Sequence, residues 1–196
     1  MKLQGYGVEL SEVTEDKIEK IRLWRNHPDI VSVMLDKSII TPTQQKAWFD
    51  SLSSKQDRLY LLISYKGEDI GIISALSVPT NHSPENSVTP PAKQQNLSLS
   101  HAEKIAPGLY IEPNSKYKNS VLAFSPSLVF IEYLFQQGCC NELEAQVFEH
   151  NESAIRYNKM LGYKEGILDD QGLLTMTLNM SDFESAKDKL SKILRF

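Results

Sequence analysis

The chain has 196 residues, of which 41% are hydrophobic, and a formal net charge of -4 at pH 7. That length and apolar content suffice for one sizeable core, so we expect a single domain over residues 1–196. The negative charge argues against a general nucleic-acid or membrane-surface binder, because there is no basic excess to neutralise phosphates.

The first ten residues, MKLQGYGVEL, contain no apolar stretch typical of a secretory signal, and no run of about 18 apolar residues follows. The only two cysteines, Cys139 and Cys140, are adjacent, and neighbouring cysteines rarely reach disulfide geometry. We therefore expect a cytoplasmic protein whose cysteines are reduced and packed.

Two helices are expected in the first third of the chain. In TEDKIEKIRLWRNHP, apolar residues recur every three positions from Ile18 to Trp24, and Pro28 is expected to end the helix. In TPTQQKAWFDSL, Thr41 is placed as an N-cap and Pro42 at the first helical position.

A β-hairpin is expected next. Residues 59–65 and 70–78 are rich in β-branched and aromatic residues and are joined by a turn at Gly67. Residues 79–100 then contain four prolines with many Ser and Asn and no apolar period. This composition favours a flexible or disordered insertion, with a lid over a substrate as the alternative.

Residues 105–113, IAPGLYIEP, are expected to form a strand. The segment KYKNSVLAFSPSLVFIEYLFQQG predicts a turn leading into an apolar helix that ends at Gly138, with Pro126 in its first turn or at a kink. The turn carries Lys116 and Lys118 near the start of the helix, where unpaired amides attract anions. An ordinary capped helix with two solvated lysines is the alternative.

The stretch VFEHNESAIRYNKMLGYKEG predicts a strand, a helix and, after a Leu-Gly-Tyr turn, a further strand. Asn151 lies at the start of the helix, where asparagine is a favoured N-cap. At 100° per residue, Asn158 falls within about 40° of Ala154 on the apolar side, and Tyr157 lies about 60° to one side. A polar amide there needs buried backbone partners or a ligand.

The chain closes with a strand over LLTMTLNM and a C-terminal helix over residues 181–196. We expect this helix to pack on the body of the domain, with a partner subunit of a homodimer as the alternative. The order of elements predicts a mixed α/β fold whose sheet is antiparallel early and gains a helix crossover late. The apolar residues that share one face of the helix are Phe183, Ala186, Leu190, Ile193 and Leu194.

These motifs carry a resemblance to a known family. The stretch from Val147 to Gly166 resembles the late strand–helix–strand of Gcn5-related N-acetyltransferases (GNATs), which reads Val, then Asn, Ala three later, and Leu-Gly-Phe/Tyr. The front half resembles the branch that acetylates nucleotide-linked amino sugars for flagellar or surface glycans, and more distantly the ribosomal-protein acetyltransferases. Its matching residues are Trp24-Arg25-Asn26, Met34, Ile40 and Trp48-Phe49.

The resemblance implies a GNAT-like fold, in which a mixed, mostly antiparallel sheet with flanking helices has two splayed central strands, GLYIEP and ELEAQVFE. Acetyl-CoA would lie between these strands as co-substrate. Its pantetheine arm would form hydrogen bonds with backbone amides of the first strand and with Asn151. Its pyrophosphate would bind to the turn that follows the first strand. The residues so assigned are Leu109, Tyr110, Ile111, Lys118, Asn119, Ser120, Val121, Leu122, Ala123 and Asn151.

Acetyl transfer to an amine needs a neutral amine beside the thioester, an amide for the developing oxyanion and a route for protons. The resemblance makes Glu103 the expected base and His101 the second choice, with a solvated loop carboxylate as the alternative for Glu103. Asn158, with Tyr157 beside it, stands where many relatives carry a Tyr that protonates the thiolate. Since Asn cannot act as an acid, water is the expected donor.

Some positions depart from the family pattern. Val121 stands where the family has glycine, and its branched side chain disfavours positive φ and blocks close approach of a phosphate. Gln146 and Gln45 stand where a carboxylate and a histidine are common. These departures leave open a module that binds acetyl-CoA without turnover.

The function expected first is N-acetylation of a small-molecule amine on a nucleotide-linked amino sugar. Arg22, Arg25, Asn26 and Trp48 are its expected substrate contacts, and a solvated helix face is the alternative for the charged residues. Acetylation of a protein N-terminus or another small amine by the same fold is the second possibility. No nucleic acid, membrane or metal ion is expected to take part.

Overall fold

The computed structural model describes residues 1–78, 98–138 and 140–194, so nearly all of the expected insertion at 79–100 lies outside the described residues. The strands are β1 (Lys2–Gly5), β2 (Val8–Glu12), β3 (Arg58–Tyr65), β4 (Glu68–Val78), β5 (Lys104–Ile111), β6 (Glu142–Phe148), β7 (Lys164–Leu168) and β8 (Leu173–Asn179). The helices are α1 (Ile18–Arg25), α2 (Pro28–Val31), α3 (Pro42–Leu52), α4 (Phe124–Gln136), α5 (Glu152–Met160) and α6 (Met180–Leu194). Short 3-10 turns are η1 (Glu15–Lys17), η2 (Leu99–His101) and η3 (Val121–Ala123).

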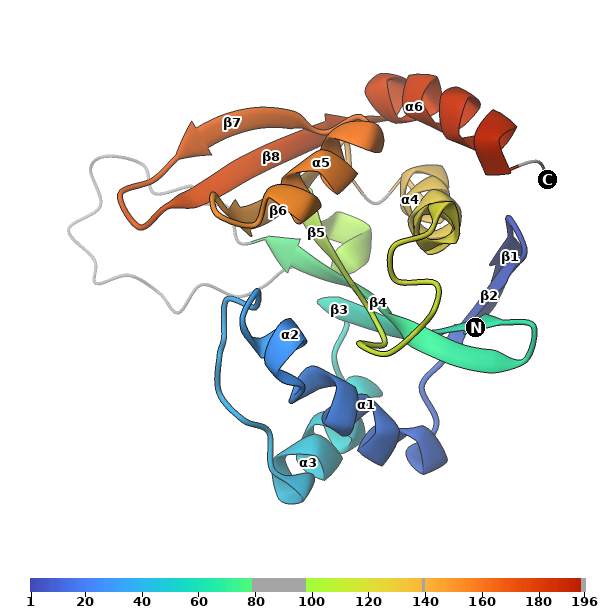
Figure 1. Ribbon diagram of the computed structural model, residues 1–196, viewed down its shortest axis with the longest axis vertical. Helices are drawn as coiled ribbons and strands as arrows, with labels where there is room; N and C mark the ends of the chain where they lie inside the picture. The colour runs from blue at the N-terminus through green and yellow to red at the C-terminus, as the bar shows by residue number, and fades with distance from the viewer. Residues whose placement is uncertain (79–97, 139, 195–196) are drawn as a thin grey trace.

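The strands of the described residues form one sheet in the order β1-β2-β3-β4-β5-β6-β8-β7 (Figure 1). All neighbouring strands are antiparallel except β5 and β6, which are parallel and joined through α4. This topology confirms the expected mixed, mostly antiparallel α/β fold. The crossover matters because it brings the start of α4 to the carboxyl ends of the central strands.

Local capping signals explain where several helices begin and end. Thr41 and Gln44 form a capping box with Pro42 in the first turn of α3, and the Asn151 side chain accepts from the backbone of α5. Pro126 lies in the first turn of α4, as expected, and Gly138 ends that helix with a φ of 63°. These features confirm the boundaries that the sequence predicts for the three helices.

Two features differ from the expectations. Pro28 begins the short helix α2 instead of only ending α1, because proline fits the first turn of a helix. The sequence analysis does not predict the N-terminal hairpin β1–β2, whose strands have only four and five residues and turn at Tyr6 and Gly7, both with positive φ. It covers the outer edge of β3.

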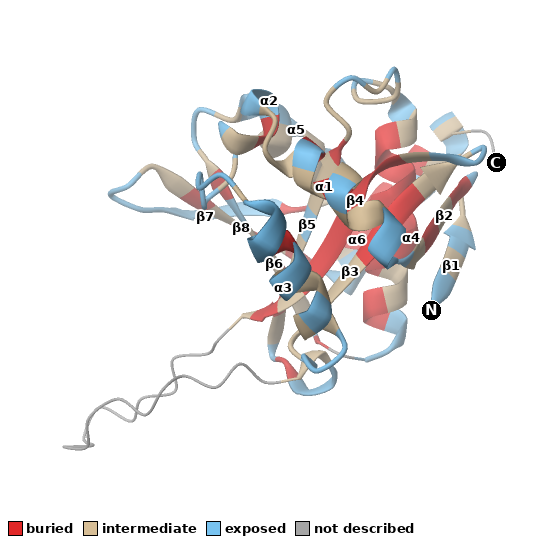
Figure 2. Ribbon diagram, turned by 90° about the horizontal axis from the view of Figure 1, so that it is seen from below, coloured by how far each residue is buried: buried red, intermediate tan, exposed pale blue. Residues whose placement is uncertain are grey.

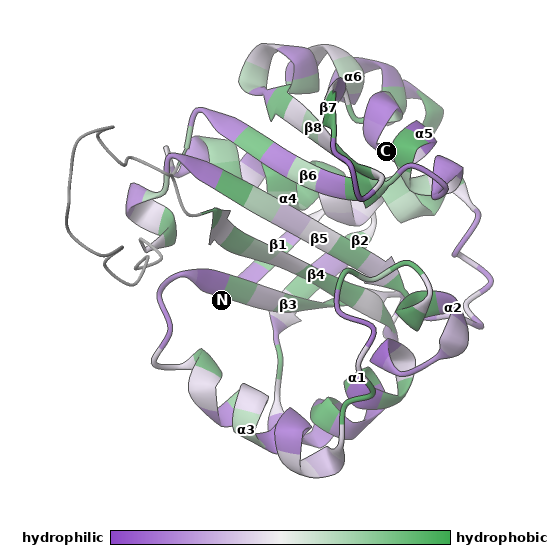
Figure 3. Ribbon diagram, turned by 90° about the vertical axis from the view of Figure 1, so that its left-hand side faces the viewer, coloured by the Kyte–Doolittle hydropathy of each residue, from purple (hydrophilic) through white to green (hydrophobic). Residues whose placement is uncertain are grey.

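The sheet separates two layers of helices (Figures 1 and 2). On one face, the long core around Phe130 and Leu128 of α4 packs on the strands; on the other, a smaller cluster centred on Trp24 joins α1 and α3 to β3 and β4. Figure 3 shows hydrophilic and hydrophobic residues mixed along the outer helices α3 and α6, as expected for helices buried on one side.

Helix α6 packs on the body of the protein, as expected. Phe183, Ala186 and Leu190 are buried, and the Phe183 ring lies 6.0 Å from that of Phe135 on α4. Ile193 departs from the expected face, because it is 57% exposed. Cys140 is buried as expected, and Cys139 lies outside the described residues.

The Leu-Gly-Tyr turn provides a test of the fold. Gly162 has a φ of 99°, and a Cβ there would lie 2.7 Å from the carbonyl oxygen of Asp182. We expect Gly162→Ala to lower the free energy of unfolding by about 2–3 kcal/mol, from backbone strain and this clash together. Urea denaturation monitored by circular dichroism measures the change.

Gly138→Ala is the matched control. Its φ is also positive, at 63°, but nothing lies within 4 Å of the added Cβ. Strain alone should cost about 1 kcal/mol. Equal losses for the two variants would contradict a contribution from the Asp182 carbonyl.

Candidate active site

The parallel strands β5 and β6 pair over only two residues at their amino ends. Lys104 lies opposite Glu142 and Ile105 opposite Leu143, whereas β5 stays paired with β4, and β6 with β8, along their whole length. Two residues past the last pair, Pro107 has no N–H group to donate to a neighbouring strand. The strands therefore part, which confirms the expected splayed central strands and leaves a gap toward their carboxyl ends.

The backbone of β5 directs amide groups into this gap. The N–H of Glu112 donates to the carbonyl of Ile70 on β4, and the β4–β5 register runs without a shift. Because amide directions alternate along a strand, Tyr110 also directs its N–H to β4, whereas Leu109 and Ile111 direct theirs to the gap. The expected backbone contribution of β5 to a ligand thus narrows to Leu109 and Ile111.

The turn before α4 lies beyond the open end of this gap. In this turn, Lys118 Nζ lies 3.1 Å from Oδ2 of Asp29 on α2. Val121 is the first residue of η3, its φ is not positive, and it is 43% exposed. No side chain caps η3 or α4. In this turn the N–H groups of Lys118, Ser120 and Ala123 already donate to backbone carbonyls, so an anion here would rely on the other N–H groups at the start of η3 and α4 and on the Lys118 ammonium. The other expected residues here are Asn119, Ser120, Leu122 and Ala123.

Tyr157 holds helix α5 against the start of α4. Its hydroxyl donates to the carbonyl of Ala123 at 2.9 Å and lies 2.8 Å from Oγ of Ser127, and its ring stacks on Phe124 with centroids 4.5 Å apart. Burial raises the pKa of this phenol. Its contacts make Tyr157 a support for the turn.

Asn158 and Asn151 occupy different environments on the same helix. The Asn158 side chain donates to the sulfur of Met176 at 3.7 Å, which is a weak acceptor. Asn151 follows the end of β6, and its Oδ1 accepts from the N–H of Ala154 at 3.3 Å, which confirms the expected cap. Asn151 therefore lies beyond the carboxyl end of β6, at the open end of the gap.

The expected base lies on the closed side of the gap. Glu103 is exposed and precedes β5 by one residue, before the last β5–β6 pair. Leu109 lies six positions farther along the chain, which is about 20 Å in an extended strand. His101 is also exposed and lies 2.9 Å from the Ser98 hydroxyl. The structure therefore does not bring either residue to the amides that line the gap.

The expected substrate contacts on α1 are engaged by the chain itself. The Asn26 side-chain amide donates through Nδ2 to the carbonyl of Ile40 and accepts through Oδ1 from the N–H of Ile40, each at 2.8 Å. Arg22 donates to the same carbonyl at 3.0 Å. Arg25 donates to the carbonyl of Asp36. These three side chains thus hold the segment between α2 and α3, which accounts for the Trp-Arg-Asn and Ile pattern structurally.

An aromatic wall stands beside this segment. The rings of Trp48 and Tyr60 meet edge to face with centroids 5.1 Å apart, and Tyr110 packs against the same cluster. Burial raises the pKa of Tyr110, and the charge of Arg25 opposes that rise. Of the expected contacts, Trp48 therefore forms part of this wall, and Arg25 acts on it through the effect of its charge on Tyr110.

The sequence analysis missed an ionic cluster where the strands part. Lys104 Nζ lies 3.1 Å from Glu142 and 3.2 Å from Glu144, and these bonds raise the pKa of Lys104. The Glu144 side chain is only 13% exposed. The sequence feature that could have indicated this cluster is the alternation Glu-Leu-Glu over residues 142–144, which places both carboxylates on one face of a strand.

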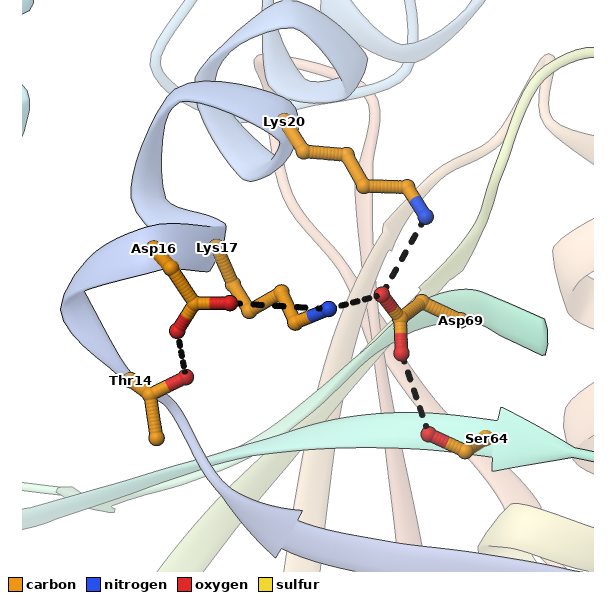
Figure 4. Close-up of polar contacts among 6 residues, drawn as sticks. All are labelled: Thr14, Asp16, Lys17, Lys20, Ser64 and Asp69. Atoms are coloured by element: carbon orange, nitrogen blue, oxygen red, sulfur yellow. Dashed lines mark hydrogen bonds and ion pairs between the residues drawn. The ribbon is translucent and has the colours of Figure 1, made fainter. Parts of the chain in front are cut away.

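Helix α1 is anchored to the sheet by Asp69 (Figure 4). Asp69 Oδ2 lies 3.1 Å from Lys17 Nζ and 3.2 Å from Lys20 Nζ, and Oδ1 accepts from the Ser64 hydroxyl at 3.3 Å. Burial raises the pKa of Asp69, but the hydrogen bonds from the two lysines outweigh burial, so this pKa lies below its ordinary value. The anchor fixes α1, and with it Arg25, over β4.

No protein-family model matches the chain. It is 26% identical over 146 residues to the acetyltransferase PseH of Campylobacter jejuni strain 81-176, a match that spans 74% of this chain and 76% of that protein.

Solved structures share the fold. Apo FdhC, a nucleotide-linked sugar GNAT, matches with a TM-score of 0.70 at 17% identity, over 99% of this chain and 98% of that one. AAC(6')-Ib in complex with paromomycin and acetyl-CoA matches with a TM-score of 0.69 at 16% identity, over 91% and 96%. The chain therefore has the GNAT fold, which confirms the expected resemblance at the level of structure.

The described residues contain neither a membrane-spanning helix nor a metal-binding cluster. Among residues 1–78, 98–138 and 140–194, no helix combines the length and apolar character needed to span a membrane. Within the same ranges, no group of three or more His, Cys, Asp or Glu side chains is arranged to hold a metal ion.

The anchor at Asp69 can be tested by stability. We expect Asp69→Asn to lower the free energy of unfolding by about 1–2 kcal/mol at pH 7, or the melting temperature by roughly 2–6 °C, because charged hydrogen bonds are lost. A carboxyl with a lowered pKa contributes its full stabilisation above its unfolded pKa of about 4, so the difference should begin to shrink below about pH 4 and disappear as the pH falls through the lower pKa of the folded state. Differential scanning calorimetry at several pH values measures both effects.

Asp16→Asn is the control for Lys17. Asp16 lies 3.6 Å from the same lysine but its side chain is 70% exposed. Its loss should leave the melting temperature within about 1 °C, since exposed pairs contribute little. A similar loss in both variants would argue against an anchor at Asp69.

Proposed function

We propose that this protein is an acetyl-CoA-dependent N-acetyltransferase whose acceptor is the amine of a nucleotide-linked amino sugar. The observation that carries the proposal is the parting of β5 and β6 after two pairs, with the amides of Leu109 and Ile111 directed into the gap. Backbone groups inside a sheet are otherwise paired, so this edge needs a strand-like partner. The extended amide-containing arm of acetyl-CoA has the matching chemistry.

The residues around the gap fit the parts of acetyl-CoA. Leu109 and Ile111 would bond the pantetheine arm, and Asn151 would add its side-chain amide at the open end. The uncapped start of η3 and α4, with Lys118 beside it, would take the pyrophosphate. The thioester supplies an activated acetyl group.

The chain's own part in the reaction is positioning and charge stabilisation. The N–H of Leu109 points into the gap, where it can stabilise the oxyanion that develops on a bound carbonyl. The acceptor would enter on the face of the sheet that carries α1 and α3, against Trp48 and Arg25. An aromatic wall suits a sugar or base ring, and a guanidinium suits a phosphate.

A nucleotide-linked amino sugar is favoured by the relatives. PseH is an acetyltransferase, and FdhC is called a nucleotide-linked sugar GNAT. Such an acceptor would place the reaction in the cytoplasm, as a step in building a surface glycan. A free aminoglycoside-like amine is the second candidate, because the AAC(6')-Ib complex with paromomycin and acetyl-CoA has a similar TM-score of 0.69.

An acceptor panel tests the proposal. We expect acetyl-CoA to bind with micromolar affinity in calorimetry, and coenzyme A to be released at least about tenfold faster with UDP-glucosamine or a dTDP-linked 4-amino-4,6-dideoxyhexose than without acceptor. Kanamycin and a peptide with a free N-terminus complete the panel. Binding without acceptor-dependent release would indicate a non-catalytic module, and no binding at millimolar acetyl-CoA would reject the proposal.

Asn151 gives a site-level test. We expect Asn151→Ala to weaken acetyl-CoA binding by about 1–2 kcal/mol, roughly tenfold, because a bond to the cofactor and a helix cap are both lost. Calorimetry with acetyl-CoA measures the affinity. Asn151→Ser keeps a capping side chain but shortens its reach, so intact stability with weakened binding would isolate the ligand contact; unchanged affinity in both variants would leave Asn151 only as a cap.

A further inference from the structure

We propose that Glu144 binds the amine of the acceptor and accepts its proton, and that Lys104 positions Glu144 for this role. The inference rests on the proposed function and deepens it. It assigns the proton acceptor to a carboxylate on β6, in place of the expected Glu103 before β5.

Glu144 lies where the two central strands separate. The last β5–β6 pair joins Ile105 to Leu143, so Glu144 is the first residue of β6 beyond the pairing. Glu103 lies on the opposite, closed side of the same pair. Of these two carboxylates, Glu144 is therefore the one next to the gap.

The carboxylate also lies on the acceptor face of the sheet. Residues at even spacing on a strand share a face, so Lys104, which bonds Glu144, shares the face of Tyr110. Tyr110 packs with the cluster under α1 and α3. Leu143, next to Glu144 on β6, is fully buried in the core on the other face.

Small residues leave space opposite Glu144. On β5, the positions that face this side past the last pair are Ala106 and Gly108, and Gly108 is exposed. An amine entering here would lie between Glu144, directly or through one water, and a thioester carbonyl held at the amide of Leu109, which is three residues or about 10 Å farther along the strands. No large side chain of β5 separates the two groups.

The ion pair with Lys104 positions the carboxylate of Glu144. That lysine is shared with Glu142, so the cluster of two carboxylates and one ammonium carries a net charge of about −1. The remaining negative charge favours a cation. An acceptor amine arrives as an ammonium ion and is the cation that the reaction supplies.

The step balances as a proton transfer followed by acyl transfer. The Glu144 carboxylate takes one proton from R–NH3+, which gives the neutral amine and a carboxylic acid. The nitrogen lone pair forms the C–N bond, the C–S bond breaks with its electron pair on sulfur, and the second nitrogen proton ends on the thiolate. Loss of the Glu144 proton to water restores the carboxylate, so acetyl-CoA and R–NH3+ give the amide, coenzyme A and H+.

Variants of the full chain test the assignment. The probes are UDP-glucosamine and the dTDP-linked 4-amino-4,6-dideoxyhexose, each compared with its own N-acetylated form. We expect Glu144→Gln to lower kcat/KM for the acceptor by about 10²-fold or more, while the Kd of acetyl-CoA changes by less than about twofold. With coenzyme A bound, it should also abolish the preference of the wild type for the amino form over the N-acetylated form.

Glu142→Gln is the matched control. It removes a carboxylate of the same charge, bonded to the same Lys104 and on the same face of β6, but inside the paired region. It should lower the rate clearly less than Glu144→Gln, because it reduces the negative charge of the cluster but leaves the proton acceptor in place, and it should keep the preference for the amine. Glu103→Gln, which lies outside the cluster, should stay within about threefold of the wild type in rate. Calorimetric unfolding of all variants checks that they fold.

The outcomes separate this inference from the proposed function. Wild-type turnover that survives Glu144→Gln, or an equal loss in Glu142→Gln or Glu103→Gln, overturns the role of Glu144 and leaves the transferase intact. Absence of acetyl-CoA binding and coenzyme A release in the wild type overturns both.

Discussion

The site depends on a break in the hydrogen-bond ladder between the two parallel strands. Pro107 stands on the side of β5 that faces β6, where it has no N–H to offer, just past the last pair at Ile105. Both strands are held on their other sides, β5 by β4 and β6 by β8. The separation is therefore supported by the rest of the sheet, and it exposes a short internal edge at which an extended ligand can complete the ladder.

The side chains at α1 that the sequence marks as substrate contacts serve as scaffold. Asn26 and Arg22 both donate to the carbonyl of Ile40, Arg22 also donates to Glu19, and Asp69 fixes α1 through two lysines. A rigid support of this kind matters because acyl transfer needs the reacting groups held within a fraction of an ångström. Shared motifs between distant proteins can thus report a common frame for the acceptor rather than a common acceptor.

The sequence predicted the helices whose ends are set by neighbouring residues. It missed the strands and side chains whose role depends on how distant strands pair. The caps at Thr41 and Asn151 and the stop at Gly138 each act through a few neighbouring residues. The hairpin of β1 and β2 is too short to show a period. Glu144 reads as a charged strand residue, and only the long-range register of β5 on β6 places it beside a gap.

The cofactor turn shows how a departure from the family pattern can be tolerated. Val121 remains in an ordinary conformation and is 43% exposed, so it does not need the glycine-like backbone that the family pattern suggests. Lys118 is tied to Asp29 by a pair whose side chains are 35% and 58% exposed. Exposed pairs contribute at most about 1 kcal/mol, whereas a pyrophosphate brings more negative charge to the start of a helix. Under the proposed function, a pyrophosphate at this turn would therefore compete with Asp29 of α2 for Lys118.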